Sequence, residues 1–298
     1  MTDRARYDRL RAQFGVGDGS SDDGTDADAT AVWNAFDLIL DTDRFLNLGY
    51  SPWYLPHAVG SSQGRLARQL GRRIALRLGH SAGVPLLDVG CGRGGPSVVL
   101  AREFGYDVTG VDLVDHNVSR ALSNAEEAGV EAAFLVGDAP QLPVATDSVR
   151  ACVVVDAAPY VADKRGLVSE LARVVEPGGV VAVSDLLRTD EVDSMAVERF
   201  IDAWDMAPLA TLADYRDMVP DAGFVATRYE DVTDHSVGRF GFWADLFLAL
   251  AGTPIGCAAE SLLGDRGIDL DAVVGQVEAT RPALPELRHY VVTARLES

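Results

Sequence analysis

The chain has 298 residues and is 48% hydrophobic. Its formal net charge of −19 disfavours long nucleic acids as substrates, because their phosphates require a basic track. Cys91, Cys152 and Cys257 are far apart, which excludes a disulfide framework and gives no metal-ligand spacing. That spacing leads us to expect no metal site. No apolar run is long enough to span a membrane and the N-terminus has no apolar signal core, so we expect a cytoplasmic protein.

The make-up of the charge is unusual. Aspartate outnumbers glutamate, and Lys164 is the only lysine. A strongly acidic chain repels itself in dilute buffer, and salt screens that repulsion. The composition therefore resembles that of haloarchaeal proteins and predicts a halophilic one.

Two regions precede the core. Residues 1–30 are predicted to be a flexible acidic segment, because Gly15–Ala29 is rich in glycine, serine and aspartate. Residues 31–298 are predicted to form a single domain. Its expected parts are an N-terminal helical cap over 31–80, a core over 84–187 and a helical insert over 192–222.

The core pattern alternates strand and helix through Leu187, which favours an α/β fold with a doubly wound, mostly parallel sheet. After the core, the pattern predicts further helices over 192–204, 212–222, 239–251 and 271–280. Two late strands are expected over 223–230 and 289–296.

A glycine-rich turn follows the first core strand. The run Leu86–Val89 leads into Gly90, Gly92 and Gly94, where a bare backbone allows a ligand to approach closely. The next strand ends in Asp112, about twenty residues further on, where a carboxylate can accept from ribose hydroxyls. The spacing alone also fits a dinucleotide site.

Two more strands end in aspartate. Asp138 follows Phe134–Gly137, and Asp156 follows a buried apolar run. In this order the motifs resemble the class I S-adenosylmethionine-dependent methyltransferases, specifically the small-molecule group of the type 11 kind. The resemblance implies a Rossmann-like, seven-stranded sheet whose last strand is antiparallel and lies between the fifth and sixth.

The same resemblance implies roles for the motif residues. Asp112 would hold the ribose, Asp138 and Ala139 the adenine, and Asp88 would lie near the methionine ammonium. Asp88 could instead brace the glycine turn by accepting backbone N–H groups. The expected cofactor-binding residues are Asp88, Gly90, Gly92, Gly94, Asp112, Leu113, Asp138, Ala139 and Asp156.

The methyl acceptor is expected to lie against additions to the core. The run Asn47–Tyr50 followed by Trp53 is similar to an entry motif of small-molecule methyltransferases, although two residues separate Tyr50 from Trp53. These aromatic residues could equally pack the N-terminal helix onto the core. The expected substrate-binding residues are Tyr50, Trp53, Tyr54 and Tyr160.

An alcohol or carbon acceptor requires a base, whereas a neutral amine does not. The candidates are Asp185 at the end of the fifth strand, His235 and His57. No histidine follows the fourth strand, where similar sugar O-methyltransferases place one, and this argues against sugar hydroxyl chemistry.

The sequence thus predicts an enzyme that transfers a methyl group from S-adenosylmethionine to an oxygen, carbon or nitrogen atom of a small molecule. If the helix over 239–251 is a lid, an apolar acceptor is favoured. The alternatives are an NAD-dependent oxidoreductase and a non-catalytic methyltransferase-like subunit. The sequence leaves open whether the protein forms a homo-oligomer.

Overall fold

The computed structural model describes residues 7–11, 41–52, 62–189, 194–251, 253 and 270–298. Its centre is a seven-stranded sheet with the order β3-β2-β1-β4-β5-β7-β6. The strands are β1 (Pro85–Val89), β2 (Asp107–Asp112), β3 (Ala133–Val136), β4 (Val149–Val155), β5 (Val175–Arg188), β6 (Phe224–Asp231) and β7 (Leu287–Leu296).

Strands β1 to β5 are parallel, and β7 runs antiparallel between β5 and β6. The predicted fold class, with its antiparallel last strand, is therefore confirmed. Because β1, β2 and β4 are parallel neighbours, their carboxyl ends lie at one edge of the sheet. The order reverses next to β1, and ligands of such sheets bind at this switch point.

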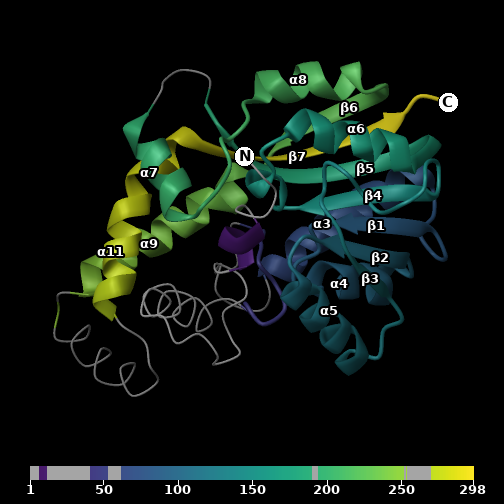
Figure 1. Cartoon of the computed structure of the whole chain (residues 1–298). Helices are drawn as coiled ribbons and strands as arrows, with labels where there is room; N and C mark the ends of the chain where they lie inside the picture. The colour runs from purple at the N-terminus through teal and green to yellow at the C-terminus, as the bar shows by residue number, and fades with distance from the viewer. Residues whose placement is uncertain (1–6, 12–40, 53–61, 190–193, 252, 254–269) are drawn as a thin grey trace.

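Helices cover both faces of the sheet (Figure 1). One face carries α3 (Ser62–Leu78) and α4 (Gly95–Phe104), whose leucines pack with β1, β2 and β4. The other face carries α6 (Lys164–Val174) and α8 (Leu212–Asp221). Helix α5 (Asp115–Glu127) packs beside β2 and β3.

A separate helical lobe stands beyond the carboxyl edge of the sheet. It contains α7 (Met195–Ala203), α9 (Val237–Ala251) and α11 (Leu270–Thr280), which gather on one side of the sheet in Figure 1. The range 192–222 was expected to form one helical insert, but its two helices pack in different places, α7 in this lobe and α8 on the sheet. None of the described helices is long and apolar enough to cross a membrane.

One buried polar contact fastens α8 to the sheet. The hydroxyl of Tyr215 donates to a carboxyl oxygen of Asp185 at 2.7 Å, and both residues are buried in the core. Burial raises the pKa of Asp185 to about 6, against the lowering effects of Lys164 and of the Tyr215 hydrogen bond.

Tyr215→Phe is expected to lower the free energy of unfolding by about 1–3 kcal/mol at about pH 8. Loss of the donor raises the pKa of Asp185 further, so the ionised carboxylate becomes costlier in the folded protein. At about pH 5 the loss is smaller, because that pH lies below the folded pKa of Asp185 and both proteins hold it protonated.

Urea unfolding followed by circular dichroism measures both values. The matched control is Tyr229→Phe, whose half-buried hydroxyl donates to a backbone carbonyl at 3.3 Å. The control should show a smaller, pH-independent change. If Tyr215→Phe lost the same free energy of unfolding at both pH values, the hydrogen bond from Tyr215 would not stabilise the ionised form of Asp185.

Candidate functional site

The turn after β1 adopts backbone conformations that favour glycine. Gly90, Gly92 and Gly94 have φ angles of 71°, 53° and 80°. A Cβ at Gly90 would lie 2.2 Å from the Cβ of Ala157, so the turn and the end of β4 approach more closely than a side chain permits. This packing presents bare backbone at the edge of the sheet.

Asp112 ties the end of β2 to this turn. Its carboxyl accepts from the N–H of Gly92 at 2.9 Å, the N–H of Val114 at 2.9 Å and the Asn117 amide at 3.1 Å. Burial raises the pKa of Asp112, and the three hydrogen bonds oppose that rise. Two carboxyl oxygens offer about four acceptor positions, so the group can still receive a donor.

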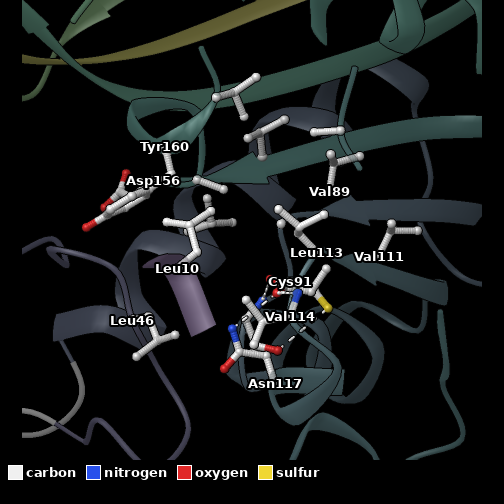
Figure 2. A pocket seen from close by; sticks show the side chains of 18 of the residues that line it. Leu10, Leu46, Val89, Cys91, Val111, Leu113, Val114, Asn117, Asp156 and Tyr160 are labelled. Atoms are coloured by element: carbon white, nitrogen blue, oxygen red, sulfur yellow. Dashed lines mark hydrogen bonds between the residues drawn. The ribbon is translucent and has the colours of Figure 1, made fainter. Parts of the chain in front are cut away.

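The first cavity lies over these residues and has a volume of about 850 Å³ with its open mouth included. Figure 2 shows Leu113, Val114 and Asn117 on one side of it and Tyr160 on another, with Leu10 of the helical residues 7–11 also in its wall. Of the expected cofactor-binding residues, it is lined by Gly90, Gly92, Asp112, Leu113, Asp138, Ala139 and Asp156.

Two expected cofactor residues lie elsewhere. Asp88 is fully buried and accepts from the hydroxyl of Ser97 at 2.6 Å, and it is not among the residues that line the cavity. Burial raises its pKa to about 7. The expected contact with a ligand ammonium is therefore corrected, because Asp88 faces α4. Gly94 lies against Ala121 and caps the start of α4.

A second cavity, of about 890 Å³ with its mouth included, adjoins the first. Leu46, Asn47, Asp156 and Tyr160 line both. Its remaining walls are mostly apolar and come from the helical lobe and the segment before α3. They include Phe45, Leu48, Pro159, Leu186, Phe200, Trp204, Met206, Val237, Phe240, Leu284 and Leu287.

Asp156 stands where the two cavities meet. Its carboxyl accepts from Nε2 of His289 at 2.9 Å, the N–H of Leu48 at 2.8 Å and the hydroxyl of Ser184. Burial opposes its ionisation, but the charge and hydrogen bond of His289 and the other two donors outweigh burial, so the pKa of Asp156 is lowered. Asp156 is therefore ionised at neutral pH.

Three residues that the sequence placed at the acceptor site have other partners in the structure. Asp185 faces α8 and Tyr215, and it lines neither cavity. His235 lines neither cavity because its imidazole stacks on the Tyr50 ring at 4.7 Å and contacts the carbonyl of Ser51 at 3.2 Å. Tyr50 is held by the same stack.

Tyr160 does lie at the site, where it lines both cavities. The turn that carries it is held by Lys164. The ammonium of Lys164, the buried lysine at the start of α6, donates to the carbonyls of Ala158 and Val161 at 3.0 Å each. Trp53, Tyr54 and His57 fall outside the described residues.

The sequence interpretation missed three residues that the structure brings to the site. Asn117 and Asn47 line cavities, and His289 contacts Asp156. Asn47 stands in the quoted Asn47–Tyr50 run, and Asn117 lies in the first helical turns after Asp112, so both had a signal in the sequence. His289 had none beyond its place in the last strand.

Comparison with known proteins identifies the central domain. Residues 87–183 match the methyltransferase domain family. An O-methyltransferase of Aspergillus sclerotiorum is 27% identical over 71% of this chain and 81% of its own length. The 2-methyl-6-phytyl-1,4-hydroquinone methyltransferase of Synechocystis sp. is 31% identical over 55% of this chain and 53% of its own length.

The fold has a close structural counterpart. The crystal structure of a putative sarcosine dimethylglycine methyltransferase from Galdieria sulphuraria superimposes with a TM-score of 0.70 at 18% identity, covering 89% of this chain and 98% of that one. The family match decides against the NAD-dependent oxidoreductase, and the relatives named as methyltransferases support an enzyme over the non-catalytic subunit. Residues 87–183 are a methyltransferase domain, and the relatives and the structural counterpart support a class I S-adenosylmethionine-dependent methyltransferase.

Proposed function

We propose that the first cavity holds S-adenosylmethionine and that the second holds an apolar small-molecule acceptor, whose methylated atom lies where the cavities meet. The observation that carries this proposal is that four residues, Leu46, Asn47, Asp156 and Tyr160, line both cavities. A methyl donor in one cavity and an acceptor in the other would therefore be in contact.

The ribose position rests on an unpaired polar atom. The amide nitrogen of Asn117 donates to Asp112, which leaves its Oδ1 buried without a partner at the cavity wall. A buried acceptor without a donor costs about 1–3 kcal/mol. Ribose hydroxyls donating to Asn117 and Asp112 would remove that cost, so these residues fit the cofactor.

The remaining cofactor contacts follow from position. Asp138 and Ala139 line the far end of the cavity after β3 and are proposed to bind the adenine, with Leu113 packed on its ring. Gly90 and Gly92 line this cavity with bare backbone, against which the methionine portion would lie.

Bound S-adenosylmethionine supplies a methyl group that its sulfonium already activates. The protein therefore contributes mainly alignment and the exclusion of water, and proximity alone is worth several kcal/mol. The apolar walls from Phe200, Trp204 and Phe240 keep the acceptor side dry. Tyr160, on the turn that Lys164 holds, lines both cavities and would help to align donor and acceptor.

The wall chemistry favours an apolar acceptor. One relative is named for a phytyl hydroquinone, a compound with an apolar chain, and this supports the choice.

Salt adaptation and a cytoplasmic location remain part of the proposal. The only lysine of the chain, Lys164, is buried, so arginine is the only strongly basic residue at the surface, against a net charge of −19. Acidic side chains then repel one another with little cationic compensation. A cytoplasm of high ionic strength would screen that repulsion.

Asn117→Ala is expected to weaken the binding of S-adenosylhomocysteine by about tenfold, since it removes an acceptor worth roughly 1–2 kcal/mol. Isothermal titration calorimetry measures the affinity. The control is Ser119→Ala, on the exposed side of the same helix, which should bind like the parent. Equal binding by Asn117→Ala and the parent would remove the proposed ribose site.

Met206→Trp is expected to abolish product formation while leaving the affinity for S-adenosylhomocysteine unchanged, because the larger ring fills the second cavity alone. The assay supplies methyl-labelled donor and a cell extract, then separates organic from aqueous label. We expect the parent enzyme to label the organic phase.

Met195→Trp is the matched control, because Met195 is exposed on α7 outside the cavity. It should keep full activity. Label confined to the aqueous phase, or an active Met206→Trp enzyme, would place the acceptor elsewhere.

The melting temperature is expected to rise by about 5 °C or more between about 0.1 M and 2 M KCl, because salt screens the acidic surface. Differential scanning calorimetry measures it. A melting temperature that is the same at both salt concentrations would count against salt adaptation.

A further inference from the structure

Asn47 is a buried amide that the protein leaves unpaired. Its side chain lies at the junction of the cavities, the residue is 4% exposed, and neither Nδ2 nor Oδ1 has a hydrogen-bond partner. Unlike a carboxyl, an amide cannot relieve burial by taking up a proton. Its unmet donor and acceptor therefore indicate a ligand group at this point.

The backbone on both sides holds Asn47 in place. The carbonyl of Phe45 accepts from the Gln63 amide at 3.2 Å, and the N–H of Leu48 donates to Asp156 at 2.8 Å. One residue further back, the carbonyl of Arg44 accepts from Gly95 at 2.9 Å. The amide is thus presented by a segment fixed to α3, α4 and the end of β4.

Asp156 is equally well fixed and provides only acceptor oxygens. It has a φ of 54°, an uncommon conformation that aspartate tolerates better than most residues. Its carboxylate is anchored by Leu48, Ser184 and His289, and the residue is 8% exposed at the shared wall.

His289 holds the carboxylate of Asp156 in place. The imidazole is fully buried on β7, with Nε2 on Asp156 at 2.9 Å and Nδ1 on the hydroxyl of Ser236 at 2.7 Å. Bonds at both ring nitrogens leave the imidazole one orientation. His289 lines neither cavity, so it acts through Asp156.

The side chains that line the second cavity disfavour an anionic ligand. Among the described residues that line it, Asp156 is the only charged side chain, and none is lysine, arginine or histidine. A phosphate or carboxylate would therefore find no cationic side chain in the wall to offset the cost of removing its charge from water, and it would approach the carboxylate of Asp156. A neutral head group that donates a hydrogen bond meets no such penalty.

We propose that the junction is a head-group site, in which Asn47 and the carboxylate of Asp156 select acceptors bearing an uncharged O–H or N–H donor on an apolar body, with His289 as the positioning residue for that carboxylate. This inference rests on the proposed function, because it assigns the second cavity to the acceptor. It adds a recognition chemistry and a rule against anionic heads.

The test uses three probes that share one ring system: 2-naphthol, naphthalene and 2-naphthoate. Each is titrated calorimetrically into the protein saturated with S-adenosylhomocysteine. We expect 2-naphthol to bind about tenfold or more tightly than naphthalene, the effect of one net hydrogen bond of about 1.4 kcal/mol, and 2-naphthoate to show no binding.

Asn47→Leu should remove the difference between 2-naphthol and naphthalene and leave S-adenosylhomocysteine binding unchanged. Met206→Leu, which changes only an apolar wall, should keep the difference. A fall in S-adenosylhomocysteine affinity in Asn47→Leu would assign Asn47 to the cofactor and overturn the proposal.

Asp156→Asn should admit 2-naphthoate, because it removes the repelling charge. His289→Leu should do the same, since the carboxylate then loses its main stabilising partner and burial raises its pKa. His289→Gln, which keeps a donor toward Asp156, should restore the rejection of 2-naphthoate. A merely structural role for His289 would not change the preferred ligand charge.

Two outcomes separate this inference from the proposed function. A parent protein that binds S-adenosylhomocysteine and both neutral probes equally, or that binds 2-naphthoate as well as 2-naphthol, refutes the head-group site alone. No binding of S-adenosylhomocysteine refutes the proposed cofactor cavity itself.

Discussion

The carboxylate of Asp156 is the point on which the site depends. It receives hydrogen bonds from Leu48, Ser184 and His289, which belong to segments far apart in the sequence. The segment before α3, the end of β4, the middle of β5 and the start of β7 therefore meet at one group. Loss of that carboxyl group would leave a buried imidazole and two buried donors without their acceptor, so the group fixes both the local architecture and the local electrostatics.

Unpaired polar atoms distinguish the ligand sites from the core. Asp88 and Asp185 each have one oxygen without a partner, but burial raises the pKa of both, and a protonated carboxyl tolerates that environment. The asparagine amides have no such relief. Asn47 and Asn117 are both buried, both have an unpaired atom and both line a cavity. We infer from these unmet hydrogen bonds that ligand atoms bind at both asparagines.

The sheet and the position of Asp112 were predictable because they follow from order along the chain. Parallel strands separated by helices place successive carboxyl ends at one edge, so an aspartate at a strand end needs no further information to be placed there. The side to which a residue on a strand points is harder to predict. In β5, Ser184 faces Asp156, whereas Asp185 faces Tyr215 on the opposite side.

This failure has a physical cause. Alternation reveals which side faces the core only when one face is polar, and β5 is buried on both faces over most of its length. The apolar run around Asp185 therefore carried no information about its direction. His235 and Tyr50 failed for a related reason, since their stacking on each other joins residues 185 positions apart and neither sequence environment indicates it.

The antiparallel last strand explains why the site includes a histidine that no motif announces. Insertion of β7 between β5 and β6 pairs His289 with Leu186, two residues beyond Ser184. Ser184 and His289 then reach the same carboxylate from neighbouring strands. The resemblance to the family predicted where this strand lies in the sheet, but its register depends on packing against the helical lobe and on the Ser236 contact at 2.7 Å. The insertion of β7, the last strand along the chain, thus brings His289 to Asp156 and stabilises the negative charge of that carboxylate.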